Sequence, residues 1–257
     1  MDLTVFGIQR SGTNFLEQCI RKNIQDARIK NQWRVDGYWK HTYDFQHKPK
    51  YDAKSKGYGE CGGQEMYDKL IDTRHRIIYI HKHPYNWIQS ICNKNVDILK
   101  TQSDMQNKNK IFPKSDQFFM FDRIDILRAA WFWTKHVSWW YELRDIIIDK
   151  HGADKSYFVA YESLIKDDQQ TLWHVKRIAD RMGLPYRNKD IIPVSVGQSD
   201  TFTESSRTRY LQIELSGFHW NHISEINKYL DKNLMKRLGY KLIETEKEFN
   251  NHKVSPV

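Results

Sequence analysis

The stretch Leu3-Thr4-Val5-Phe6-Gly7-Ile8-Gln9-Arg10-Ser11-Gly12-Thr13-Asn14 decides the fold that this sequence predicts. Residues 3–8 are mostly apolar, as in a buried strand, and from about Thr13 to Asn23 apolar side chains recur at helical spacing. Between them, Gly7 and Gly12 allow backbone N–H groups to close around an anion at the start of the helix. The stretch therefore predicts a strand, a phosphate-binding loop and a helix.

Two further strand-like runs, Arg76–Ile80 and Tyr157–Tyr161, stand later in the chain. Helical patterns begin near Pro84 and cover about 124–149 and about 168–182. Strands that alternate with helices predict an α/β fold with a central parallel sheet flanked by helices. We expect one domain over residues 1–245, followed by a loosely held tail at 246–257.

Two long segments, Asp36–Gly63 and Lys94–Phe119, do not follow this alternation of strands and helices. Long irregular segments in a compact domain are usually functional lids or loops. Both lie between predicted strands, and the carboxyl edge of an α/β sheet places its ligand loops there. We expect residues 36–63 and 94–119 to form acceptor-site loops.

The composition favours a soluble protein with a polyanionic partner. The 257 residues carry a formal charge of +9 and 14% aromatic residues, and Lys and Arg are spread along the chain rather than gathered in one arm. Cys19, Cys61 and Cys92 form neither a CxxC pair nor a zinc pattern, so we expect reduced thiols. Neither a signal peptide nor an apolar run of about 18 residues is visible, which predicts a cytoplasmic protein without a membrane span.

The loop departs from the Walker pattern of nucleotide kinases. That pattern requires Lys directly after the second glycine, and this chain has Thr13 there, with its basic residue earlier at Arg10. By itself, such a loop is equally well explained as a strand-to-helix turn with a Ser/Thr cap.

The segment Arg10-Ser11-Gly12-Thr13 resembles the 5′-phosphosulfate loop, Lys/Arg-Ser/Thr-Gly-Thr, of sulfotransferases that use PAPS (3′-phosphoadenosine 5′-phosphosulfate). A second segment, Tyr79–Ser90, resembles that family's 3′-phosphate motif, in which Arg-x-Pro opens a helix that bears Ser. Lys82 stands in the Arg position and Ser90 in the Ser position, while Asn86 replaces the common Asp. Lysine presents a single charged group, whereas arginine can form two parallel hydrogen bonds to one phosphate. Taken alone, Lys82 could equally be a lysine at a sheet edge.

A third segment resembles the family's Trp-rich helix and the strand that follows it. His136-Val137-Ser138-Trp139-Trp140 precedes Phe158-Val159-Ala160-Tyr161-Glu162-Ser163-Leu164, and Met182-Gly183-Leu184 matches a later turn. Tyr161 falls where the family has a tyrosine that contacts adenine. The matches occur in the family's order over residues 3–24, 76–92 and 131–185.

The resemblance implies a three-layer, P-loop-NTPase-like sulfotransferase fold. It also implies sulfuryl transfer from PAPS to an acceptor hydroxyl, with PAP (3′-phosphoadenosine 5′-phosphate) as product and no metal. Phe15 either stacks on adenine or packs in the core. Arg207 and Arg209 either replace the family's missing Arg-Lys-Gly clamp or form a solvated basic turn. The residues predicted to bind PAPS are Arg10, Ser11, Gly12, Thr13, Asn14, Phe15, Lys82, Ser90, Tyr161, Arg207 and Arg209.

The predicted catalytic residues are His41, Lys40 and Arg10. Family members often take their general base, a His with a Lys close by, from a loop between the two phosphate motifs, and Lys40-His41 occupies such a loop. Histidine has an unperturbed pKa suited to the task. Arg10 would stabilise the leaving phosphate, and Glu60 and Asp44 remain alternative bases.

Two other classes of protein compete with this interpretation. A P-loop nucleotide kinase would need Lys after Gly12 and metal-binding carboxylates at a strand end. A basic nucleic-acid-binding protein would fit the charge and the aromatic content, yet the chain has no KH, RRM, zinc-finger or helix-turn-helix signature. We therefore expect a small-molecule or glycan hydroxyl as acceptor, with a carbohydrate or another polar compound favoured, and no nucleic acid.

Overall fold

The computed structural model of the chain describes residues 2–29, 41, 71, 76–93, 120–121, 124–194, 203–213 and 215–254. Two compact units divide the chain. The first contains Met1–Lys82 and Trp139–Arg207, and the second contains His83–Ser138 and Thr208–Val257. The single domain expected over residues 1–245 stays a prediction, and each unit is described by itself below.

The first unit is built on a four-stranded parallel sheet with the order β2-β1-β3-β6. The strands are β1 (Asp2–Phe6), β2 (Arg28–Ile29), β3 (Arg76–His81) and β6 (Ser156–Ala160). Residue Phe6 pairs with Tyr79, and His81 pairs with Ala160, so all three long strands end at the same edge. The predicted parallel sheet is confirmed. The two-residue strand β2 was missed because it is too short to show a period.

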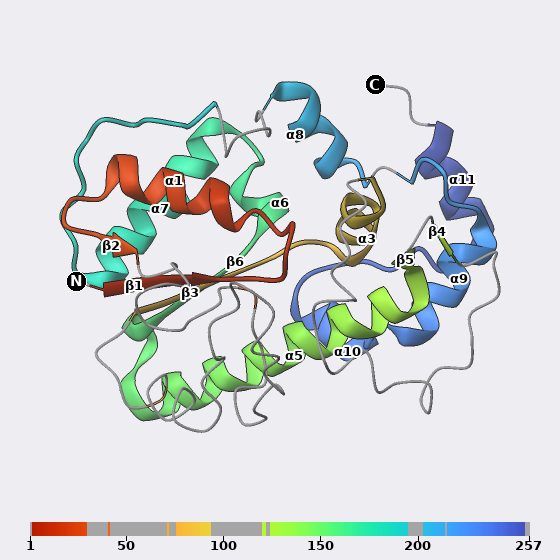
Figure 1. Cartoon of the computed structure of the whole chain (residues 1–257), viewed down its shortest axis with the longest axis horizontal. Helices are drawn as coiled ribbons and strands as arrows, with labels where there is room; N and C mark the ends of the chain where they lie inside the picture. The colour runs from red at the N-terminus through yellow and green to blue at the C-terminus, as the bar shows by residue number, and fades with distance from the viewer. Residues whose placement is uncertain are drawn as a thin grey trace, which may run out of the picture. The chain divides into compact units, whose positions relative to one another are not determined.

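Helices cover both faces of this sheet (Figure 1). On one face lie α1 (Thr13–Asn23) and α7 (Asp168–Met182), and on the other lies the part of α5 (Ile126–His151) that begins at Trp139. The Trp140 ring lies 4.5 Å from Phe6 and 5.1 Å from Tyr79 between centroids. Because successive strand side chains alternate between faces, Ile78 and Ile80 point the other way, toward α1 and α7. The predicted three-layer α/β fold is confirmed.

Short helices and local capping interactions connect the strands and helices of the first unit. The short helix η3 (Ala153–Lys155) leads into β6, and α6 (Tyr161–Leu164) follows it. At the start of α7, the Asp167 side chain accepts a hydrogen bond from Gln170 N. At its end, Gly183 adopts a left-handed conformation with φ 64°, which closes the predicted turn.

The second unit is mainly helical. Its elements are α3 (Pro84–Asn93), β4 (Met120–Phe121), β5 (Ile124–Asp125), the first part of α5, α9 (Trp220–Tyr229), α10 (Lys232–Arg237) and α11 (Glu246–Val254). Helix α8 (Glu204–Leu211) carries the boundary between the units at Arg207. Residues 246–254 form a helix with Phe249 buried, which corrects the expectation of a loosely held tail.

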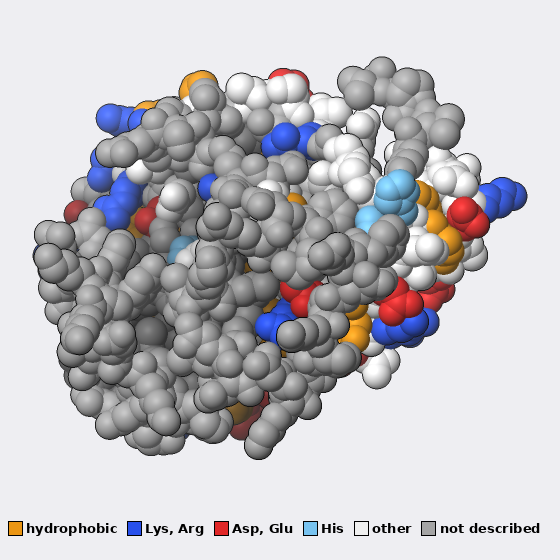
Figure 2. All heavy atoms as spheres, turned by 45° about the vertical axis from the view of Figure 1, so that its right-hand side comes forward, with side chains coloured by type: hydrophobic (Ala, Val, Ile, Leu, Met, Phe, Trp, Pro, Cys, Tyr) orange, Lys and Arg blue, Asp and Glu red, His pale blue; other side chains and the backbone are white. Residues whose placement is uncertain are grey.

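The described surface matches the dispersed charge expected from the sequence. On the face drawn in Figure 2, Lys and Arg side chains occur in several small groups with Asp and Glu among them. Within the described part of the chain, no helix is both long enough and apolar enough to cross a bilayer.

Candidate functional site

The carboxyl edge of the sheet gathers three segments that are far apart in the sequence. The loop of Gly7 follows β1, Lys82 follows β3, and Tyr161 follows β6. Strands β1 and β3 are neighbours, while the chain leaves β1 toward β2 on its other side. This is a switch point of an open parallel sheet, where such folds bind their ligands.

The loop after β1 lies tightly against β3. A Cβ atom at Gly7 would lie 2.4 Å from the Ile80 carbonyl oxygen, so only glycine fits there. The chain then turns through a hydrogen bond from Ser11 N to Ile8 O, 3.1 Å long. Two residues hold left-handed conformations, Arg10 with φ 67° and Gly12 with φ 97°. Successive backbone N–H groups of such a turn can point to one side, which suits an anion.

The Ser11 side chain is fully buried, and its hydroxyl has no hydrogen-bond partner among the described residues. Burying a hydroxyl without a partner costs about 1–3 kcal/mol. A ligand with acceptor oxygens would remove that cost. Among the described residues nothing accepts a hydrogen bond from the Ser11 hydroxyl, so this donor could serve a bound anion.

Helix α1 begins at this loop without an acidic side chain in its first turn and without a side-chain cap at Gly12. Its positive dipole end is therefore not neutralised by a carboxylate of its own first turn. Thr13 is buried at the same end, and Asn14 is exposed. The Phe15 side chain is only 2% exposed, which favours core packing over an adenine stack.

Lys82 and Tyr161 meet beside Gly12. The Lys82 ammonium lies 4.3 Å from the centre of the Tyr161 ring, close enough for a cation–π interaction. The same ring packs on Gly12, where a Cβ atom would lie 2.3 Å from Tyr161 Cδ2. Lys82 is only 2% exposed and Tyr161 only 5%. Three residues predicted from three separate motifs are thus in one place.

His41 is held against the loop. Its Nδ1 donates a hydrogen bond to the Gly7 carbonyl oxygen, with 2.6 Å between the two atoms. Because a carbonyl oxygen can only accept, Nδ1 carries the hydrogen, and in the neutral ring Nε2 has the basic lone pair. The predicted base is therefore in a tautomer able to take a proton at Nε2. Lys40, Glu60 and Asp44 lie outside the described residues.

Two other histidines are built into the cores of their units. His83 hydrogen-bonds to Lys241 O through Nε2 at 3.2 Å, and burial lowers its pKa to about 4. His174 lies between the hydroxyls of Tyr157 and Ser163, and burial lowers its pKa to about 4 as well. Groups with such low pKa values stay neutral at pH 7 and are weak bases, so His41 remains the better candidate.

Ser90 lies in the second unit, where it belongs to a polar cluster with α8. Its hydroxyl lies 3.3 Å from the Tyr210 hydroxyl, which accepts a hydrogen bond of 3.3 Å from Arg209 Nη2. One turn earlier on α3, Asn86 Nδ2 donates to Tyr210 O at 2.6 Å. An aspartate at this position could not donate that bond. Ser90 and Arg209 are brought together, while the shared 3′-phosphate site of Lys82 and Ser90 stays a prediction.

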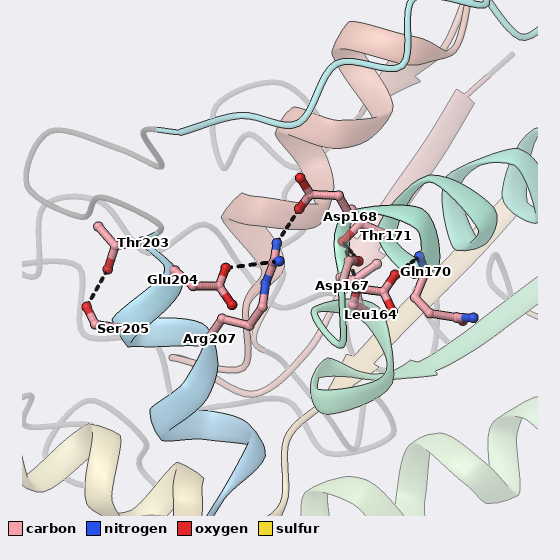
Figure 3. A network of polar contacts seen from close by, with 9 residues as sticks. All are labelled: Leu164, Asp167, Asp168, Gln170, Thr171, Thr203, Glu204, Ser205 and Arg207. Atoms are coloured by element: carbon pink, nitrogen blue, oxygen red, sulfur yellow. Dashed lines mark hydrogen bonds and ion pairs between the residues drawn. The ribbon is translucent and has the colours of Figure 1, made fainter. Parts of the chain in front are cut away.

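Arg207 belongs to the first unit and bonds to carboxylates (Figure 3). One guanidinium nitrogen binds Asp168, and another lies 3.1 Å from a Glu204 oxygen. Two carboxylates around one arginine leave a local charge of minus one, which disfavours a phosphate. Arg207 thus joins α8 to the start of α7, while the clamp role predicted for Arg209 stays a prediction.

Tyr210 is the residue that sequence reasoning missed. It stands next to Arg209 in a basic segment, but no local pattern links it to Ser90, which lies 120 residues earlier. Among the described residues, no group of three or more His, Cys, Asp or Glu is placed as metal ligands.

Comparison with known proteins supports the fold. The structure is similar to that of the mouse sulfotransferase SULT7A1 complexed with PAP, with a TM-score of 0.50 and 12% sequence identity. The match covers 99% of this chain and 89% of the mouse chain. No model of a known protein family matches the sequence, and no curated protein matches it. The chain thus has a sulfotransferase-like α/β fold.

Proposed function

We propose that this protein is a PAPS-dependent sulfotransferase that transfers a sulfuryl group to an acceptor hydroxyl. The observation that carries the proposal is the convergence of Gly12, Lys82 and Tyr161 at the switch point, with the Lys82 ammonium 4.3 Å from the Tyr161 ring centre. These residues come from the three sequence motifs, and the carboxyl ends of adjacent parallel strands bring them to the edge where such folds bind ligands.

The anion-binding chemistry of the loop fits the 5′-phosphosulfate of PAPS. The buried Ser11 hydroxyl, the uncapped start of α1 and the Arg10 guanidinium supply donors and positive charge. Lys82 adds a buried, positively charged amine beside the loop. Tyr161 offers its ring beside this cation, at the position where the family contacts adenine.

The proposed reaction is an in-line displacement at sulfur. The acceptor oxygen forms a bond to sulfur while the bond from sulfur to the 5′-phosphate oxygen breaks, and the acceptor proton passes to His41 Nε2. Charge develops on the departing phosphate oxygen, where the Arg10 guanidinium stabilises it. The Gly7 carbonyl holds the His41 ring and stabilises the imidazolium that forms. A polar hydroxyl compound or a carbohydrate is the proposed acceptor.

Calorimetry with PAP and ATP tests this function. We expect PAP to bind at least tenfold more tightly than ATP, because the loop has Arg10 and lacks the Walker lysine. Arg10→Gln should weaken PAP by roughly 10- to 100-fold through loss of a charged hydrogen bond. Tighter binding of ATP would favour a nucleotide kinase, and binding of mixed oligonucleotides without PAP binding would favour a nucleic-acid-binding protein.

A further inference from the structure

One imidazole ring joins the two sides of the strand-to-helix corner at which Tyr161 stands. His174 Nδ1 lies 2.7 Å from the Tyr157 hydroxyl on β6, and its Nε2 lies 2.9 Å from the Ser163 hydroxyl on α6. Tyr157 comes before Tyr161 in the chain and Ser163 comes after it. His174 therefore connects the strand that leads to Tyr161 with the short helix that begins there.

Helix α6 depends on contacts of this kind. It has only 4 residues, and a helix of that length is not stable without outside support. Helix α7 supplies two bonds to it. Thr171 Oγ1 donates to Leu164 O at 2.7 Å (Figure 3), and His174 bonds to the Ser163 hydroxyl. Thr171 and His174 are both buried and lie on the same side of α7, so they hold α6 from a fixed surface.

A neutral imidazole suits this position between two hydroxyls. Burial lowers the pKa of His174 to about 4, so the ring is uncharged at pH 7. A neutral ring has one donor nitrogen and one acceptor nitrogen, and a hydroxyl can serve either. Burial also raises the pKa of Tyr157 to about 12, so its phenol keeps the hydrogen. Both bonds can therefore exist together throughout the neutral pH range.

The position of α6 sets the position of the Tyr161 ring. That ring packs on Gly12, where a Cβ atom would lie 2.3 Å from Tyr161 Cδ2. On the ring lies the Lys82 ammonium, 4.3 Å from the centroid. A displacement of α6 would change both contacts, because Tyr161 is the first residue of that helix.

We infer that His174 is a positioning residue that holds Tyr161 ready for the nucleotide. The inference rests on the proposed function, in which Tyr161 contacts the adenine of PAPS. His174 acts through Ser163 and α6, and the Tyr157 hydroxyl orients its ring. Because the Tyr161 ring is held in place before the nucleotide arrives, less conformational freedom is lost on binding.

Calorimetry with PAP on Ser163→Ala tests this inference. Ser163 is exposed, so the substitution removes one hydroxyl without leaving a cavity in the core. We expect PAP to bind about 3- to 10-fold more weakly, as for one lost hydrogen bond. Ser163→Thr keeps a hydroxyl and should restore most of the affinity. Ser224→Ala is the matched control, because its hydroxyl bonds to Asn221 O in the second unit, and PAP affinity should not change.

Two double variants show how the effect reaches the nucleotide. Tyr157→Phe should also weaken PAP, but in a Ser163→Ala background it should add less than about twofold, because the imidazole then has no serine to hold. In a Tyr161→Leu background, Ser163→Ala should have no further effect. Losses that multiply in either double variant would show that the residues act independently, and they would overturn the inference.

Hydrogen exchange tests the connection without any ligand. The Ile165 amide donates to Tyr161 O at 3.0 Å and reports on the opening of α6. Its exchange should become about 3- to 10-fold faster in Ser163→Ala and stay unchanged in Ser224→Ala. Unchanged exchange in Ser163→Ala, or faster exchange with unchanged PAP affinity, contradicts the inference and leaves the proposed function standing. If the unmodified protein does not bind PAP, the proposed function and the nucleotide role of His174 fail together, and the exchange rates still decide whether His174 holds α6.

Discussion

The phosphate-type loop after β1 and the polar cluster of Ser90, Tyr210 and Arg209 are assembled differently. In the loop, consecutive residues set the backbone, with Arg10 and Gly12 in left-handed conformations and Gly7 against Ile80. In the cluster, side chains of α3 and α8 meet across 120 residues of sequence. The first arrangement is local, and the second depends on tertiary packing.

This difference predicts how each region responds to substitution. Backbone donors need no particular side chain, but they need the conformations that glycine permits. Side-chain donors lose function with a single hydroxyl or guanidinium, while the backbone around them is unchanged. The backbone of the loop should therefore be disrupted by added atoms, and the cluster by removed ones.

The largest expected effect concerns His41, which has no counterpart in the cluster. His41→Ala should lower turnover by roughly 10²- to 10⁴-fold while PAP still binds, because the proton acceptor is lost. PAPS hydrolysis serves as the assay until an acceptor is identified, since water then takes the place of the acceptor hydroxyl.

His41→Asn separates the two roles of the ring. The asparagine amide can keep the hydrogen bond to Gly7 O, but it has no basic nitrogen. Turnover as low as in His41→Ala supports a general base. Near-normal turnover in His41→Asn would reduce His41 to a support for the loop and move the search for the base to Glu60 or Asp44.

Next in size is Gly12→Ala, which tests the backbone part of the comparison. The new methyl group would lie 2.3 Å from Tyr161 Cδ2 in a left-handed conformation with φ 97°. Strain and overpacking together should lower the free energy of unfolding by about 2–5 kcal/mol. Urea denaturation measures the loss.

Gly183→Ala is the matched control for this prediction. Gly183 is also left-handed, with φ 64°, but its Cβ would meet nothing within 4 Å. It should cost only about 1 kcal/mol. Equal losses for the two variants would show that the contact of Gly12 with Tyr161 contributes nothing.

The smallest expected effect compares two arginines on α8. Arg209→Gln should weaken PAP by about tenfold, as for one lost charged hydrogen bond. Arg207→Gln should change PAP affinity by less than threefold, because Arg207 bonds to Asp168 and Glu204. Calorimetry at one fixed salt concentration measures both, since charge pairs are screened by salt. The reverse order of effects would return the phosphate clamp to Arg207.

Much of the first unit could be predicted because its signals are local. The apolar runs and helical periods located β1, β3, β6, α1 and α7 to within two residues at each end. The prediction of a loosely held tail at 246–257 missed helix α11 because that helix has no clear local signal. Residues 246–254 are mostly polar, and a buried Phe249 gives no local sign of the helix that it anchors.

By itself, the sequence determined the parallel strands, the phosphate-type loop and the start of α1, because periodicity and glycine conformations act over a few residues. Only the tertiary structure decided which arginine of α8 bonds to carboxylates and which stacks on Tyr210. Arg207 and Arg209 stand two residues apart in the same basic segment. Arg207 bonds to Asp168, 39 residues away, whereas Arg209 bonds to Tyr210, whose hydroxyl also contacts Ser90. Hydrogen-bond partners so far apart in the sequence are set by the packing of helices and strands, and no short sequence pattern predicts them.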